Sequence, residues 1–192
     1  MAAICVFCAS SRVLDKRWLD LATETGRELA RRGHTVVSGG GCVGMMGALA
    51  DGARTGGGRT FGVIPQALVD LEVADVHADE LVVTDDMLGR KAVMIEKSDA
   101  FLTLPGGLGT MDELFEVWTT ATIGIHRKPV VLLDVDGFYR GLLDWLAGLA
   151  GTGFVGARAL DTLVVVDSVA AALDAMEARL GQPVPPPRDG TQ

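Results

Sequence analysis

The stretch AFLTLPGGLGTMDE, residues 100–113, joins a short apolar run to a glycine-rich loop and then to a segment typical of a helix start. Glycine lets the backbone turn sharply and brings N–H groups close to an anion, and the following helix adds a partial positive charge. In open parallel sheets, ligands bind where such loops leave the carboxyl ends of the strands. The stretch therefore predicts an α/β fold with a phosphate-binding loop at residues 105–110.

The rest of the chain repeats this alternation of short apolar runs and longer amphipathic stretches. The pattern predicts the fold class α/β, as a Rossmann-like doubly wound parallel sheet of about seven strands with helices on both faces. The expected strands are residues 3–7, 35–38, 60–63, 80–84, 100–104, 129–133 and 162–166. The expected helices are residues 15–32, 43–53, 86–98, 110–123, 141–149 and 169–180.

The length and composition fit one domain with a substantial core, because 48% of the 192 residues are hydrophobic. We expect this domain to cover residues 1–182, and the proline-rich end, residues 183–192, to be a flexible tail. No run of about eighteen apolar residues could span a bilayer, and the N-terminus shows no basic leader. We therefore expect a cytoplasmic protein that does not bind a membrane.

The charge, the cysteines and the histidines argue against a nucleic-acid-binding protein, a redox protein and a metalloenzyme. The net charge is −8 and the 17 Lys and Arg residues are scattered, which argues against binding a nucleic acid. The pair Cys5 and Cys8 matches C-x-x-C, but residues three apart in a strand point to opposite faces, so a redox or zinc pair is not expected. His34, His77 and His126 show no ligand spacing, and we expect no catalytic metal and no cofactor.

A second glycine-rich loop, residues 39–44, satisfies G-x-G-x-x-G between an expected strand and an expected helix. The dinucleotide fingerprint also requires an acidic residue about twenty positions further on, where this chain reads FGVIP, residues 61–65. A full dinucleotide site is therefore not favoured. The glycines either permit close packing of helix on strand or contact a ligand directly, and both interpretations stay open.

Two further groups each have a structural and a functional interpretation. Thr110 and Glu113 form T-x-x-E, which is a capping box, although capping does not explain the glycines before it. Arg90 stands four residues after Asp86, which is the spacing of a helical ion pair. Arg90 and Lys91 would alternatively bring two cations toward the glycine loop, because basic residues in the first turns of a helix oppose its dipole.

These motifs together resemble the LOG family, phosphoribohydrolases that release cytokinin bases from their riboside 5′-monophosphates. The family pattern P-G-G-x-G-T-x-x-E is complete at residues 105–113, and M-x-x-R-K is complete at residues 87–91. The resemblance extends over about residues 4–155. It implies a homodimer that takes a nucleotide substrate, either a cytokinin riboside 5′-monophosphate or AMP.

The resemblance also implies site residues. Arg90 and Glu113 would be the catalytic pair. The substrate-binding residues would be Glu72, Lys91, Gly106, Gly107, Gly109, Thr110 and Thr119. Cleavage of an N-glycosidic bond builds positive charge on the ribose, which a fixed carboxylate stabilises. The chain departs from the family pattern where relatives read T-W-A-Q, because residues 119–122 are TTAT, and Ala9 replaces a usual glycine. The preferred base stays open.

Three alternatives compete with this hydrolase. A nucleotide or cofactor carrier of the same fold would have no need of Arg90 and Glu113 together. An oxidoreductase that uses NAD would need the missing ribose-binding acid. A decarboxylase that uses pyridoxal phosphate would need a Schiff-base lysine, and none of Lys16, Lys91, Lys97 and Lys128 stands in a suitable setting, so we reject it.

Overall fold

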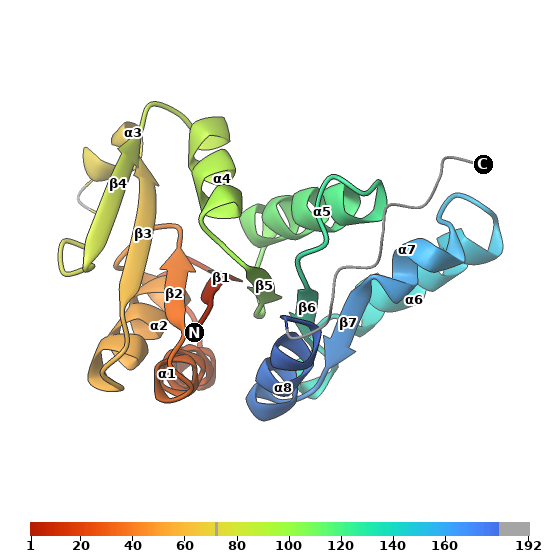
Figure 1. The fold of residues 1–192 in the computed structure, drawn as a ribbon, viewed down its shortest axis with the longest axis horizontal. Coiled ribbons are helices and arrows are strands. Elements are labelled where there is room, and N and C mark those ends of the chain that lie inside the picture. The colour runs from red at the N-terminus through yellow and green to blue at the C-terminus, as the bar shows by residue number, and fades with distance from the viewer. Residues whose placement is uncertain (72, 181–192) are drawn as a thin grey trace.

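The computed structural model describes residues 1–71 and 73–180, which form a seven-stranded parallel sheet between layers of helices (Figure 1). The strands are β1 Ala3–Phe7, β2 Thr35–Ser38, β3 Thr60–Pro65, β4 Glu80–Thr84, β5 Ala100–Thr103, β6 Val130–Leu133 and β7 Leu163–Val166. Each lies within two residues of its predicted bounds, and every pairing is parallel. The predicted fold class is confirmed.

The helices connect these strands. They are α1 Lys16–Arg31, α2 Gly44–Thr55, α3 Gln66–Val69, α4 Met87–Glu96, α5 Leu108–Thr122, α6 Arg140–Gly151, α7 Ala157–Asp161 and α8 Val169–Leu180, with a 3-10 turn η1 at Val135–Gly137. The six predicted helices are present. The sequence does not predict α3 and α7, because four or five residues are too few to show a helical period.

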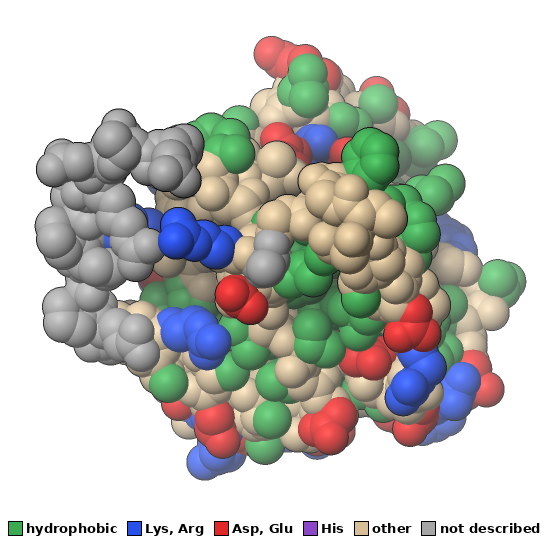
Figure 2. Space-filling model, turned by 90° about the vertical axis from the view of Figure 1, so that its right-hand side faces the viewer, with side chains coloured by type: hydrophobic (Ala, Val, Ile, Leu, Met, Phe, Trp, Pro, Cys, Tyr) green, Lys and Arg blue, Asp and Glu red, His purple; other side chains and the backbone are tan. Residues whose placement is uncertain are grey.

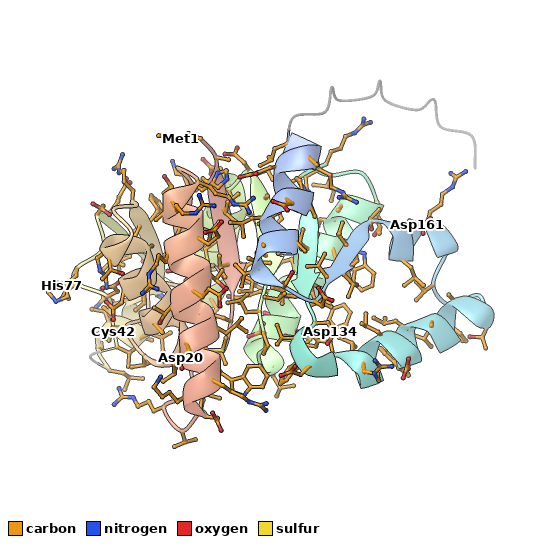
Figure 3. All side chains as sticks on the ribbon, turned by 90° about the horizontal axis from the view of Figure 1, so that it is seen from below. Met1, Asp20, Cys42, His77, Asp134 and Asp161 are labelled. Atoms are coloured by element: carbon orange, nitrogen blue, oxygen red, sulfur yellow. The ribbon has the colours of Figure 1, made fainter. Side chains whose placement is uncertain are left out.

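Two apolar cores lie on the two faces of the sheet. One packs the sheet against α1, α2 and α8, and Figure 3 shows α1 and α8 side by side across that face. The other packs it against α4, α5 and α6. Cys8 belongs to the first core and Cys5 to the second, so the two thiols lie on opposite faces of β1, as predicted.

The strand order is β4-β3-β2-β1-β5-β6-β7. The chain runs from β1 through β2 and β3 to β4 at one edge of the sheet. It then crosses back to β5 and continues through β6 to β7 at the other edge. The crevice between the loops after β1 and β5 is therefore the topological switch point, where ligands of such sheets bind.

The described helices include none that is both long and apolar enough to cross a membrane. The face at the α6 and α7 end shows basic side chains interspersed with acidic and apolar ones (Figure 2). The expected flexible tail, residues 183–192, lies outside the described residues.

Candidate active site

A cleft of about 240 Å³ opens at the switch point. One wall is the loop after β1, from Cys8 to Ser11, and the other is the first turns of α5 with Glu113. Arg90 from α4 and Met46 from α2 complete the lining. Four elements that are distant in sequence therefore meet at the carboxyl ends of the central strands.

The α5 wall presents hydrogen-bond donors to the cleft. The helix follows Gly107, which makes no side-chain cap, and begins at Leu108, two residues earlier than predicted. The first N–H groups of a helix have no partner within it, so those of Leu108, Gly109 and Thr110 remain available in the cleft that these residues line. The position is suited to an anion because the helix dipole adds partial positive charge.

Thr110 lies inside the helix and does not cap it. The residue is only 4% exposed, and its hydroxyl, which lines the cleft, makes no hydrogen bond within the described part of the chain. A Cβ at Gly106 would collide with the Thr110 side chain, so the glycine is required by close packing. The capping-box interpretation of Thr110 and Glu113 is therefore wrong.

Glu113 lies one helical turn further along the same wall and is 9% exposed. Its Oε1 is 3.4 Å from Nη1 of Arg90. Burial raises the pKa of Glu113 to about 7, and the positive charge of Arg90 opposes this rise. A carboxyl group with a pKa near neutrality, next to a cation in a cleft, is typical of an acid–base residue.

Arg90 is fixed by backbone carbonyls. Its Nε donates to the Val63 carbonyl at 3.1 Å, and its Nη2 donates to the Gly39 carbonyl at 3.3 Å. Asp86 instead caps α4 by accepting a hydrogen bond from the Gly89 N–H at 2.7 Å. The helical ion pair between Asp86 and Arg90 is therefore a wrong interpretation, and the arginine points into the site.

The second glycine loop acts behind the cleft. A Cβ at Gly39 would collide with Nη2 of Arg90. Gly44 has a φ of 60° and packs against the backbone of the loop after β1, and the next N–H, that of Met45, donates to the Ala9 carbonyl at 2.9 Å. Of this region only Met46 lines the cleft. The geometry favours the packing interpretation over direct ligand contact.

Several predicted substrate-binding residues lie outside this cleft. Lys91 pairs with Asp112 at 2.9 Å and Glu116 at 2.7 Å, and it lines a small neighbouring hollow that also includes Glu113. Thr119 lines a groove beside α6 and α7. Gly106 lines an apolar cavity of about 220 Å³ that shares Ala9, Ser11 and Gly107 with the cleft. Glu72 lies outside the described residues.

The loop after β1 and Met46 are lining residues that the sequence does not assign to the site. Residues 8–11 follow a predicted strand, but they contain no glycine and no charge that would single them out. Met46 is partly buried and also packs against the first core. Tyr139 also supports the site, because its hydroxyl donates to the Leu104 carbonyl at 2.7 Å just before the glycine loop.

None of the described lysines lines the cleft. The ion pairs with Glu116 and Asp112 raise the pKa of Lys91, whereas a Schiff-base lysine needs a lowered one. Among residues 1–71 and 73–180, no three His, Cys, Asp or Glu side chains gather in the manner of a metal site.

The parallel sheet, the helix N-terminus at its switch point and the buried pair of Glu113 and Arg90 define a Rossmann-like α/β protein whose cleft holds a carboxyl group paired with an arginine. The family model described as "Possible lysine decarboxylase" matches residues 46–176. The chain belongs to this family, and the resemblance to the LOG proteins is confirmed by its relatives.

One relative is the cytokinin riboside 5′-monophosphate phosphoribohydrolase of Mycobacterium tuberculosis, 52% identical over 90% of this chain and 91% of the relative. A phosphoribohydrolase of the same name from Arabidopsis thaliana is 42% identical over 84% of this chain and 75% of the relative. Among solved structures, a molybdenum cofactor carrier protein of Chlamydomonas reinhardtii has a TM-score of 0.71 at 23% identity, covering 94% of this chain and 99% of the carrier. This last likeness shows the fold alone.

Proposed function

We propose that the protein hydrolyses the N-glycosidic bond of a cytokinin riboside 5′-monophosphate or of AMP and releases the free base and ribose 5-phosphate. The observation that carries the proposal is Glu113, a buried carboxyl paired with Arg90 in the cleft that also holds the unpaired donors of α5. The names of the relatives support the same reaction.

The two ends of the α5 wall of the cleft have different roles in the reaction. The 5′-phosphate binds at the N-terminus of α5, where the first N–H groups and the Thr110 hydroxyl have no partner among the described residues. Glu113 follows Thr110 by three residues, so it stands about one turn, roughly 5 Å, deeper along the helix. Phosphate binding thereby orients the ribose so that its anomeric carbon faces the carboxylate.

Bond cleavage is driven by the ionised form of Glu113. As the bond between base and ribose breaks, positive charge develops on the ribose, and the buried carboxylate stabilises it more than it stabilises the neutral ground state. Water attacks the anomeric carbon and gives its proton to Glu113, while the departing base nitrogen gains a proton from solvent. Arg90 favours the ionised form of Glu113, because its positive charge lowers the pKa that burial raises.

A carrier of the same fold is the second candidate, since the carrier proteins share this architecture. A buried ion pair is costly to desolvate and adds little stability by itself. A carrier has no need of a carboxylate aimed into its ligand cleft. The pair of Glu113 and Arg90 therefore favours the hydrolase.

The decisive experiment incubates the full chain with AMP and with isopentenyladenosine monophosphate and measures free base and ribose 5-phosphate by chromatography. We expect release of base, and a loss of kcat of at least about a hundredfold in Glu113→Gln. Binding of either nucleotide without release of base would overturn the hydrolase and favour the carrier. Full activity of Glu113→Gln would overturn the assigned role of the carboxylate.

The functional unit is proposed to be a homodimer of the domain of residues 1–182, acting in the cytoplasm. Large apolar side chains on α4, on α5 and just after α5 are exposed, and a partner would bury them. These are Met87, Leu88, Leu108, Ile123 and Ile125. Association there would also place a partner close to Lys91 and Thr119, whose substrate-binding roles remain part of this proposal.

A further inference from the structure

We infer that the hydroxyl groups of Ser10 and Ser11, in the loop after β1, hold the phosphate of the substrate from the side opposite α5. The inference rests on the proposed function, because it concerns the same cleft and the same nucleotide. It adds two binding residues that neither the sequence motifs nor the names of relatives assign.

The first argument is the number of donors that the phosphate needs. A phosphate monoester presents three terminal oxygens and nearly two negative charges near pH 7. The α5 wall offers the N–H groups of Leu108, Gly109 and Thr110 together with one hydroxyl. These donors approach the phosphate from one side only, so oxygens that face the other wall need other partners.

The second argument is the shortage of positive charge. Among the described lining residues, Arg90 is the only cation, and its guanidinium is engaged with two carbonyls and Glu113. Lys91 does not line the cleft, and its ammonium is paired with the carboxylates of Asp112 and Glu116. The dianion must therefore be satisfied mainly by neutral donors, and hydroxyl groups are such donors.

Ser10 and Ser11 are the lining residues that can provide them. Both line the cleft and are exposed to it. The Ser10 hydroxyl makes no hydrogen bond within the described residues. The Ser11 Oγ accepts a hydrogen bond from the Val13 N–H at 3.3 Å, which leaves its own proton free to donate.

The loop is held in place without ligand. The Met45 N–H donates to the Ala9 carbonyl at 2.9 Å, and the Leu104 N–H donates to the Phe7 carbonyl at 2.9 Å. Gly44, with its φ of 60°, lets α2 begin directly against the backbone of Ser10 and Ser11. A preorganised wall loses little entropy when a phosphate binds, so its hydroxyl groups contribute to affinity.

The test is calorimetric titration of the full chain with ribose 5-phosphate and with AMP, for wild type, Ser10→Ala, Ser11→Ala and the double variant. Hydrogen bonds to charged groups are strong, so we expect each single change to weaken binding about tenfold and the double change more. Steady-state assays with AMP should show the loss in KM rather than in kcat. With adenosine, which lacks the phosphate, the variants should match wild type.

Ser168→Ala is the control for loss of an exposed hydroxyl outside the cleft; it also removes the hydrogen bond from the Ala171 N–H at the start of α8, so its stability is measured alongside. Thermal unfolding of each variant shows whether the fold is kept. Ser11→Thr retains a hydroxyl, so it should bind ribose 5-phosphate as wild type does if the loss in Ser11→Ala comes from the missing hydroxyl and not from a damaged loop. Unchanged binding of ribose 5-phosphate by the double variant would overturn the inference, as would failure of wild type to bind it. If wild type binds AMP through these serines but releases no base, only the hydrolase proposal fails.

Discussion

Glu113 shows how a single residue acquires its chemistry from its surroundings. The same carboxyl group on the exposed side of α5 would titrate near its ordinary value, as an exposed glutamate does. Here it is buried against Arg90 at the end of a cleft, and its pKa is raised to about 7. The raised value places its change of charge near neutral pH.

The first prediction concerns the pH dependence of activity and stability. In the proposed mechanism the ionised carboxylate of Glu113 is the reactive form, so kcat/KM should rise with pH through about 7 and level off above it. Stability should change in the opposite direction. The folded chain holds the proton more tightly than the unfolded chain, so the stabilisation is fully present below pH 4.5 and is lost as pH rises through about 7.

Glu113→Gln removes this titration. Its melting temperature relative to wild type should therefore increase between pH 4.5 and 8, with a free-energy difference of up to about 3 kcal/mol. Glu24→Gln, an exposed change on α1, is the control and should leave the pH profile unchanged. A constant difference in melting temperature between wild type and Glu113→Gln across this pH range would contradict the raised pKa of Glu113.

Gly39 shows how an element that does not line the cleft can still control it. The loop after β2 presents its carbonyl to Arg90, and a side chain at that glycine would occupy the place of the guanidinium. The G-x-G-x-x-G pattern of residues 39–44 therefore belongs to a loop that supports Arg90. Gly39 allows close contact with Arg90, and Gly44 allows close contact with the loop after β1.

We therefore predict that Gly39→Ala displaces Arg90 and lowers kcat/KM with AMP by about a hundredfold, as small misplacements of catalytic groups do. The chain should still fold, with a loss of about 1–3 kcal/mol from overpacking. Gly148→Ala in α6 is the matched control, because a methyl group there meets open space. A wild-type kcat/KM in Gly39→Ala would contradict this prediction, because it would show that activity does not depend on the position of Arg90.

At the scale of the whole molecule, the fold was accessible from sequence because each strand is a short apolar run bounded by polar or glycine residues. The α5 boundary was misplaced because T-x-x-E fits a cap, whereas the helix starts two residues earlier at Leu108. The pairing of Arg90 with Glu113 is a contact between residues 23 positions apart, from 90 to 113, and only the family pattern indicated it.

The other cleft residues could not be predicted for a different reason. Ser10, Ser11 and Met46 carry no pattern of their own, and they line the site because the sheet order places β1 beside β5. The spacing of residues along the chain does not reveal which strands are neighbours in the sheet. The sequence predicts Lys91 as a substrate-binding residue, and it does not show the ion pairs with Asp112 and Glu116 that the structure adds.

The last prediction concerns assembly. Five large apolar residues on or near α4 and α5 are between 47% and 92% exposed, and a partner subunit would bury them. Light scattering after size exclusion should give twice the 20.1 kDa of one chain. Leu88→Glu with Ile125→Glu should shift the chain toward the monomer, whereas the control Val76→Glu should not. A monomeric wild type at micromolar concentration would contradict the dimer.

The proposed phosphate-binding end of α5 and the carboxyl group of Glu113 belong to one helix, so no hinge or loop separates the two groups. Their spacing is set by the helical pitch. We therefore expect substrates to be selected by length. A nucleotide whose phosphate chain is one group longer, or a sugar whose phosphate sits on a different carbon, would bind at the same end with its reactive carbon out of register with Glu113.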